Sequence, residues 1–204
     1  MIKNIVFDMG GVLMRFDKRI FLERLHVAKE DSLLLERELF RSVEWAQMDR
    51  GLLEDVDAAK IICARLPERL RDAAAKLITM WDRPILPIEG METLIAELFE
   101  NGYFIYLISN ASTRQHEYWP RIPASRYFKD TLISADVKTV KPQPEIYLLA
   151  YQKFGISPGE SVFIDDLPSN CEAAIFTGMN AIVFNDDVEE LRKKLAEKGV
   201  HVKA

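Results

Sequence analysis

Short apolar runs that end in polar residues alternate with helical segments along most of the chain. The first run, residues 2–7, is rich in β-branched side chains and ends at Asp8, which is typical of a strand buried on both faces. Similar runs cover residues 103–108, 131–134, 161–164 and 181–184, and helical patterns cover 88–101, 144–154 and 188–197. Strands that alternate with helices of about ten residues predict an α/β fold, a doubly wound parallel sheet with helices on both faces.

Residues 18–81 have a different character. Charged and apolar residues follow helical spacing there, as at Phe21, Leu22 and Leu25, which indicates amphipathic helices. Residues 31–32 and 49–51, Pro67 and Pro84 are plausible helix boundaries. We therefore expect an insert of three or four helices. It divides the chain into a Rossmann-like core of residues 1–16 and 85–204 and a small, all-helical unit of residues 17–84.

Composition disfavours several classes of partner. The net charge is −5, whereas nucleic-acid binding proteins need clustered Lys and Arg. No run approaches the length of a membrane span, and the apolar start of the chain is too short for a signal peptide. The 2 cysteines lie far apart, so we expect reduced thiols. The expectation is a cytoplasmic protein with a small-molecule partner and no nucleic acid or membrane, leaving monomer and dimer open.

Polar side chains stand at or shortly after the ends of four predicted strands. In chain order they are Asp8, then Ser109 and Asn110, then Lys141, then Asp165 and Asp166. Each alone has a structural explanation: a turn aspartate, a helix cap, a solvated lysine or a loop. Because ligands bind outside the carboxyl ends of parallel strands, the whole set is expected to converge on one crevice.

Phosphoryl transfer through a carboxylate is the chemistry that suits this set. Asp8 can attack and form a covalent intermediate, but its charge repels an anionic phosphate. Adjacent carboxylates invite a cation, and Mg²⁺ prefers oxygen ligands. Asp8 and Asp166 would bind the ion directly, and Asp165 directly or through water. Lys141 would neutralise a phosphate oxygen and steady Asp8.

Hydrogen-bond donors complete the predicted phosphate site. The Ser109 hydroxyl and nearby backbone amides, including that of Asn110, would donate to the phosphoryl oxygens. Gly10 and Gly11 would let the backbone approach the phosphate closely.

Four ordered segments resemble the motifs of the haloacid dehalogenase superfamily. They are VFDMGGVL at residues 6–13, LISN at 107–110, KPQPEIY at 141–147, and VFIDD at 162–166 followed by Asn170. The resemblance runs from end to end, and residues 17–84 look like the family's helical cap. It implies an Mg²⁺-dependent phosphatase that acts on a small phosphorylated metabolite through an aspartyl phosphate on Asp8. Residues 109–120 further resemble the helical-cap branch that contains an α-D-glucose-1-phosphate phosphatase, which suggests a sugar phosphate.

The resemblance also implies roles for individual residues. Asp8 and Lys141 would be catalytic. The phosphate-binding set would be Gly10, Gly11, Ser109, Asn110 and Lys141, and the metal ligands would be Asp8, the carbonyl of Gly10, Asp165 and Asp166.

Gly10 departs from the family's phosphatase pattern. Phosphatases of this superfamily usually carry there a second aspartate that protonates the leaving group and then activates water. General acid–base help is worth about 10²–10⁴-fold in rate, so its loss predicts slow turnover unless the leaving group is good or another acid substitutes. Asp17 and Asp49 are the candidates, each with the alternative of a helix cap or a surface carboxylate.

Gly10 also keeps two other functions open. Metal-independent 2-haloacid dehalogenases lack the second aspartate too, although their pattern lacks the acidic pair of residues 165–166. A weakly catalytic, phosphate-binding regulatory protein is the other alternative.

The substrate would be chosen by a loop of the insert that covers the crevice. The candidate is residues 44–51, EWAQMDRG, in which Arg50 could bind a second anionic group. A plain turn with Trp45 in the core of the insert is the alternative. His116 and Trp119 are further candidates for lining the pocket, or else structural residues.

Overall fold

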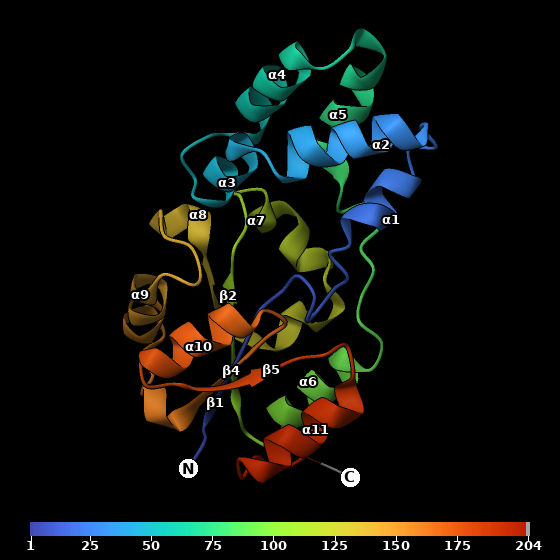
Figure 1. Ribbon diagram of the computed structural model, residues 1–204. Helices are drawn as coiled ribbons and strands as arrows, with labels where there is room; N and C mark the ends of the chain where they lie inside the picture. The colour runs from blue at the N-terminus through green and yellow to red at the C-terminus, as the bar shows by residue number, and fades with distance from the viewer. Residues whose placement is uncertain (203–204) are drawn as a thin grey trace.

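The computed structural model describes residues 1–202 and contains a five-stranded parallel sheet (Figure 1). The order is β3-β2-β1-β4-β5, so the chain adds strands on one side of β1 and then crosses to the other. The strands are β1 (Asn4–Phe7), β2 (Phe104–Ser109), β3 (Phe128–Ile133), β4 (Ser161–Asp165) and β5 (Asn180–Val183). The predicted doubly wound α/β fold is confirmed, and the reversal of strand order beside β1 is where such sheets bind ligands.

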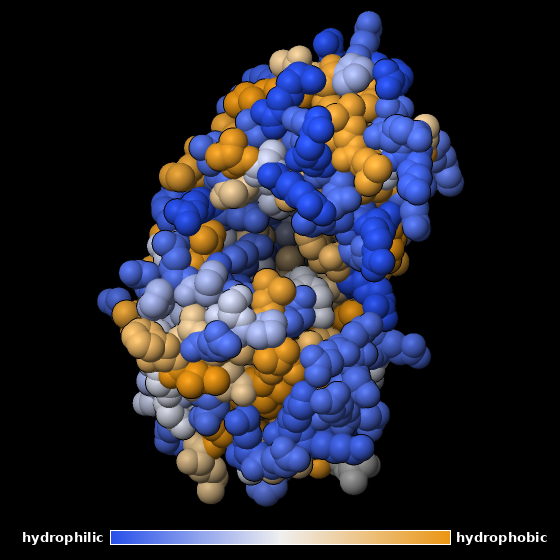
Figure 2. Space-filling view, in the orientation of Figure 1, coloured by the Kyte–Doolittle hydropathy of each residue, from blue (hydrophilic) through white to orange (hydrophobic). Residues whose placement is uncertain are grey.

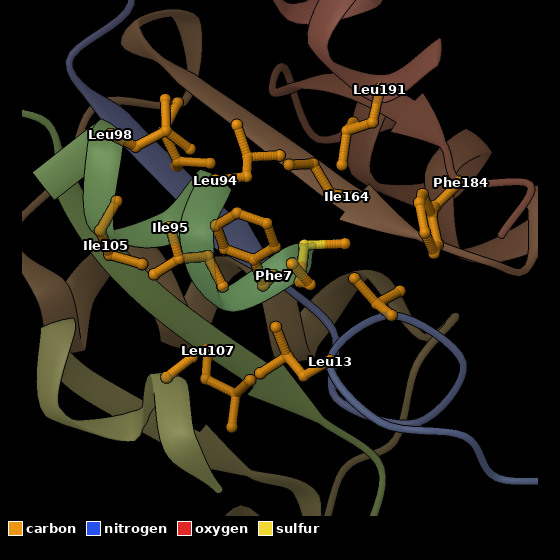
Figure 3. Packing of buried hydrophobic residues seen from close by; sticks show 14 of the residues in the cluster. Phe7, Leu13, Leu94, Ile95, Leu98, Ile105, Leu107, Ile164, Phe184 and Leu191 are labelled. Carbon is orange, nitrogen blue, oxygen red and sulfur yellow. The ribbon is translucent and has the colours of Figure 1, made fainter. Parts of the chain in front are cut away.

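Alternate side chains of the buried strands pack under different helices. Phe7 faces the layer formed by α6 (Met91–Glu100) and α11 (Val188–Glu197), where it meets Leu94 and Ile95 (Figure 3). Its neighbour Val6 packs with residues of α9 (Pro144–Phe154) and α10 (Pro168–Phe176) on the opposite face. Strands covered on both faces need continuous apolar runs, which is why these strands could be recognised in the sequence.

The helices between Lys18 and Met80 form a helical unit with a hydrophobic cluster of its own (Figure 1). The insert is richer than expected, with five α-helices and one π-helix instead of three or four helices. The predicted boundary at residues 31–32 is wrong, because both lie inside the second helix. The helices are α1 (Lys18–Glu23), α2 (Lys29–Leu35), a π-helix (Glu36–Phe40), α3 (Val43–Asp49), α4 (Asp55–Arg65) and α5 (Glu68–Met80).

The elements that sequence periodicity missed are short or partly exposed. Helices of four residues, or of one 3-10 turn, are too brief to show a helical period. The third strand begins at Phe128 instead of residue 131, because its first half is only partly buried and carries Lys129 and Asp130. The missed helices are α7 (Gln115–Tyr118), α8 (Ser134–Val137), α10 (Pro168–Phe176) and the 3-10 turns at Trp119–Arg121, Pro123–Tyr127 and Pro158–Glu160.

The insert is fastened to the sheet by a buried ionic cluster. Asp82, in the turn that follows α5, is fully buried and accepts hydrogen bonds from Arg114 and Arg121 of the core. Two guanidinium groups on one buried carboxylate satisfy the charge that burial would otherwise penalise. None of the helices within residues 1–202 is both long and apolar enough to cross a membrane.

Candidate active site

Three ionisable side chains meet at the carboxyl ends of β1 and β4. The Lys141 Nζ lies 2.6 Å from Asp8 Oδ1 and 2.8 Å from Asp165 Oδ2, and all three residues are buried. Burial raises the pKa of Asp8 to about 7, against the opposing effect of the Lys141 charge. Burial also opposes the charge of Lys141, but the two carboxylates outweigh it and raise its pKa. The lysine is therefore a permanent cation inside the site.

Asn110 positions Lys141 through its backbone. Its side-chain oxygen accepts a hydrogen bond from the Lys141 N–H at 2.8 Å, and its amide donates to the Lys141 carbonyl at 2.9 Å. Lys141 precedes α9, which starts at Pro144, a residue favoured in the first helical turn. Ser109 is buried at the end of β2 and does not border the cavity above the cluster, so its predicted hydrogen bond to phosphate stays a prediction.

Asp165, the last residue of β4, and Asp166, which follows it, have different environments. The Asp165 carboxylate is saturated by protein donors, because it accepts from the Leu167 N–H at 2.8 Å and from the Asn170 amide at 3.0 Å besides Lys141. Asp166 is half-buried and borders the cavity. Burial, followed by repulsion from Asp165, raises the pKa of Asp166.

Asp8, Asp165 and Asp166 together form a cluster of the kind that binds a divalent cation. Each offers a carboxylate oxygen, and these atoms lie within 4.8 Å of one another. Such hard oxygen donors suit Mg²⁺. The residues present therefore fit the ion that the sequence led us to expect.

Gly11 sets the distance between the loop after β1 and Asp166. Its φ is +80°, and a Cβ atom built there would lie 2.5 Å from Asp166 Oδ2. Any other residue would therefore strain the backbone and displace the carboxylate.

Replacing Gly11 by Ala is expected to weaken Mg²⁺ binding by about 10–100-fold, because Asp166 must move. Calorimetric titration with Mg²⁺ measures this directly. Gly102→Ala is the matched control, since Gly102 has φ +85° and open space at its Cβ position. Both variants should lose about 1–2 kcal/mol of stability. An equal Mg²⁺ affinity in the two variants would contradict a role for Asp166 in the cation site.

A cavity of about 350 Å³ lies between the cluster and the helical unit. Figure 2 shows the corresponding hollow where the two parts of the molecule meet. Its floor includes Asp8, Lys141 and Asp166. The opposite side is formed by the helical unit and its connections. It carries Lys18, Asp49, Asp55 and a group of apolar side chains. The apolar group comprises Phe16, Trp45, Met48, Ile78 and Trp81.

Phe16 occupies the space beside Gly10. A Cβ atom on Gly10 would lie 3.3 Å from the Phe16 Cβ and 3.7 Å from its Cγ. The Phe16 ring is itself held by neighbours, with its centroid 5.0 Å from that of Trp81 and 5.5 Å from that of Phe21. The direction in which a side chain at position 10 would leave is thus filled by an anchored aromatic ring.

The two candidate substitutes for the missing acid lie in different places. Asp17 caps α1 and binds Arg19, whose hydrogen bond holds the pKa of Asp17 below its ordinary value, and it does not border the cavity. Asp49 ends α3 and does border the cavity. Burial, followed by repulsion from Asp55, raises the pKa of Asp49 to about 7.

The predicted substrate loop is mostly helix. Residues 43–49 form α3, and residues 50–51 form the turn that follows it. Trp45 lines the cavity and also belongs to the aromatic cluster of the insert, whereas Arg50 does not border the cavity. His116 and Trp119 lie elsewhere as well: His116 pairs with Asp136, and Trp119 packs against Phe128.

Sequence reasoning missed several residues on the wall of the cavity. Asp55 accepts a hydrogen bond from Ser112 at 3.2 Å, and its carboxylate lies 3.5 Å from Arg114. Tyr118 borders the same space, and burial raises its pKa. Nothing in the local pattern marks these residues, because they become neighbours only when the insert lies on the sheet.

Residues 2–178 match the family of haloacid dehalogenase-like hydrolases. Among curated proteins, the flavin mononucleotide hydrolase 1 of Arabidopsis thaliana is 26% identical over 78% of this chain and 63% of its own length. The chain thus spans less than two thirds of that relative. The phosphorylated carbohydrates phosphatase of Thermotoga maritima is 28% identical over 87% of this chain and 82% of its own.

Solved structures of low identity share the fold. An enzyme of this family from Bacteroides thetaiotaomicron, in complex with magnesium and inorganic phosphate, has a TM-score of 0.72 at 24% identity, over 94% of this chain and 99% of that one. The L-2-haloacid dehalogenase of Xanthobacter autotrophicus has a TM-score of 0.67 at 16% identity, over 99% and 85% of the two chains.

Proposed function

Since this chain belongs to the haloacid dehalogenase-like hydrolase family, we propose that it is an Mg²⁺-dependent phosphatase that acts through Asp8. The observation that carries the proposal is the buried Asp8–Lys141–Asp165 contact beside Asp166, at the floor of a cavity. Phosphoryl transfer to a carboxylate requires three groups in one place: an oxygen nucleophile, a positive charge such as the lysine ammonium, and a set of oxygen ligands for a metal ion.

Asp8 would attack phosphorus with one carboxylate oxygen while Lys141 holds Oδ1 at 2.6 Å. The same ammonium would neutralise a phosphoryl oxygen, and the backbone at Gly10 and Gly11 would approach the phosphate closely. Asn110 keeps Lys141 in place through two backbone hydrogen bonds.

Asp8, Asp166 and the carbonyl of Gly10 would hold Mg²⁺, which offsets the repulsion between a carboxylate and a phosphate. We place Asp165 behind them as the partner of Lys141, reaching the ion through water, because its oxygens already accept protein hydrogen bonds.

The helical unit, residues 17–84, would act as a cap that encloses the leaving group. The upper cavity combines flat aromatic rings such as Trp45 with the carboxylates of Asp49 and Asp55. Rings suit the apolar faces of a sugar, and carboxylates accept its hydroxyls. Together with the carbohydrate phosphatase among the relatives, this supports a small phosphorylated metabolite, and a sugar phosphate in particular, as substrate.

The cellular setting stays a prediction. Both cysteines, Cys63 and Cys171, are free thiols, which supports the expected reducing, cytoplasmic location.

The wild-type protein is expected to hydrolyse 4-nitrophenyl phosphate with Mg²⁺ and to lose this activity in EDTA, because an unneutralised cluster repels the substrate. Added Mg²⁺ should restore it, and nitrophenolate absorbance follows both steps. Activity on 2-chloropropionate that survives EDTA would instead establish the dehalogenase alternative, which Gly10 and its filled neighbourhood keep open. Binding of phosphate without hydrolysis of any phosphoester would establish the regulatory alternative.

A further inference from the structure

One carboxylate in the cavity belongs neither to the cation cluster nor to an ion pair. Asp8, Asp49, Asp55 and Asp166 are the aspartates that line the cavity. Asp8 and Asp166 belong to the cluster, and Asp55 is engaged by Ser112 and Arg114. Within residues 1–202, no hydrogen bond or ion pair of the Asp49 side chain is found.

The backbone of Asp49 is fixed to the core. Its carbonyl accepts a hydrogen bond from the Ser134 hydroxyl at 2.5 Å, and that hydroxyl accepts from the Ala111 N–H at 3.0 Å. Two residues later the Gly51 carbonyl accepts from Lys138 of the core. This tethering keeps the last turn of α3 over the carboxyl ends of β2 and β3.

The turn that contains Gly51 packs closely against the core. The φ of Gly51 is +62°, and a Cβ atom there would collide with the Ala135 carbonyl oxygen. A backbone held at such a junction keeps Asp49 at the wall of the cavity.

The surroundings of Asp49 favour its protonated form. Burial raises its pKa to about 7, and the facing carboxylate of Asp55 on α4 adds to the effect. Tyr118 of α7 and, on the same side, Arg114 also face this region, while Lys18 of α1 lines the cavity. Across the cavity lie Asp8, Asp166 and Lys141. A carboxyl group with a pKa near neutrality suits both donation and acceptance of a proton.

We propose that Asp49 is the general acid and base of this phosphatase, supplied by the cap in place of the carboxylate that Gly10 lacks. The inference rests on the proposed function. Asp8 forms a bond to phosphorus, the bond from phosphorus to the leaving oxygen breaks, and Asp49 gives that oxygen its proton. Water then attacks the aspartyl phosphate and gives a proton to Asp49, so phosphate leaves and the Asp8 carboxylate is regenerated.

Phe16 explains why the acid comes from the cap. The ring lies beside Gly10 and packs against Trp81, so a side chain at position 10 would be crowded by Phe16. Asp17 is an unsuitable substitute, since it lies outside the cavity and is bound to Arg19.

The test is Asp49→Asn assayed on two substrates of different leaving group. Nitrophenolate leaves without a proton, whereas the phenolate of phenyl phosphate is much more basic and needs one. We expect kcat/KM to fall about 10²–10⁴-fold on phenyl phosphate and to change little on 4-nitrophenyl phosphate. Asp17→Asn, which removes a carboxylate outside the cavity, should leave both values unchanged.

Rapid mixing supplies a readout that a structural role would not move. With 4-nitrophenyl phosphate, Asp49→Asn should release one equivalent of nitrophenolate in a burst and then turn over slowly, because water attack on the aspartyl phosphate has lost its base. If the Asp49→Asn variant did not fold, Asp49→Ser would provide the same measurements. Equal losses of kcat/KM on both substrates, or no loss on phenyl phosphate, would overturn the inference.

The pH profile gives a second readout. Wild-type kcat/KM on phenyl phosphate should decline above about pH 7, as Asp49 loses its proton. Asp49→Asn should lack this decline. The raised pKa also means that the fold disfavours ionised Asp49, so stability is lost as pH rises from the unfolded value of 3.8 towards 7. The variant should therefore melt at a higher temperature than wild type at pH 8, and not at pH 4.

Failure of this inference and failure of the proposed function look different. A wild-type protein that hydrolyses neither aryl phosphate with Mg²⁺ would refute both. Hydrolysis by wild type that persists on phenyl phosphate in Asp49→Asn would refute only the role of Asp49.

Discussion

Asp8→Asn is expected to abolish hydrolysis of 4-nitrophenyl phosphate, with a loss of about 10⁵–10⁶-fold in kcat, as removal of a covalent nucleophile does in other enzymes. An amide oxygen cannot attack phosphorus as a carboxylate does. The substitution keeps the shape of the side chain, so the buried site should stay packed. Steady-state release of nitrophenolate measures the loss.

Chemical trapping makes the same prediction specific to the covalent step. Rapid quenching of the wild type with a phosphorus-labelled substrate should leave label on the protein at Asp8, and Asp8→Asn should carry none. Asp130→Asn is the control, because Asp130 forms an exposed ion pair with Lys153 and does not line the cavity. Full activity in Asp8→Asn would remove Asp8 from the mechanism.

The sheet could be predicted from the sequence because its strands are buried on both faces. Residues 4–7 of β1 are all buried, so every position had to be apolar or, as for Asn4, paired internally. The helices α9 and α11 were placed at their observed bounds, Pro144–Phe154 and Val188–Glu197, because both have ten or more residues and clear start signals.

The floor of the site was predictable for a related reason. Asp8 follows β1 and Asp165 ends the neighbouring strand β4 in register, Phe7 lying opposite Ile164, so strand ends alone bring the two carboxylates together. The sequence left open whether Asp165 would bind the ion directly or through water, because its environment depends on tertiary donors such as Asn170.

The side of the cavity that the insert forms could not be predicted, because it depends on how the insert lies on the sheet. The hydrogen bond from Ser134 to the Asp49 carbonyl joins residues 85 positions apart. Phe16 likewise lies beside Gly10 only because of the path that the chain takes between the two residues. Local periodicity predicts the helices of the insert in outline and says nothing of such long-range contacts.

Lys141→Met is expected to remove activity and to lower the free energy of unfolding by about 3–5 kcal/mol, because it leaves buried carboxylates without their cation. In the native protein the ammonium lies within 2.8 Å of both Asp8 and Asp165. Chemical denaturation followed by circular dichroism measures the loss. Lys153→Met is the matched control, since it breaks the exposed ion pair with Asp130 and should change stability by less than about 1 kcal/mol.

The pH dependence of this destabilisation identifies its cause. Burial already raises the pKa of Asp8 to about 7, and Lys141 opposes that rise. Without the lysine the folded-state pKa of Asp8 must climb further, and a raised carboxyl pKa makes stability fall as pH increases. The deficit of Lys141→Met relative to wild type should therefore be larger at pH 8 than at pH 5. A deficit that is the same at both pH values would point to lost packing around the lysine stem, because packing does not titrate. Adding Asp8→Asn to Lys141→Met should then recover part of the stability at pH 8 and none of the activity, since the double variant removes an uncompensated charge together with the nucleophile.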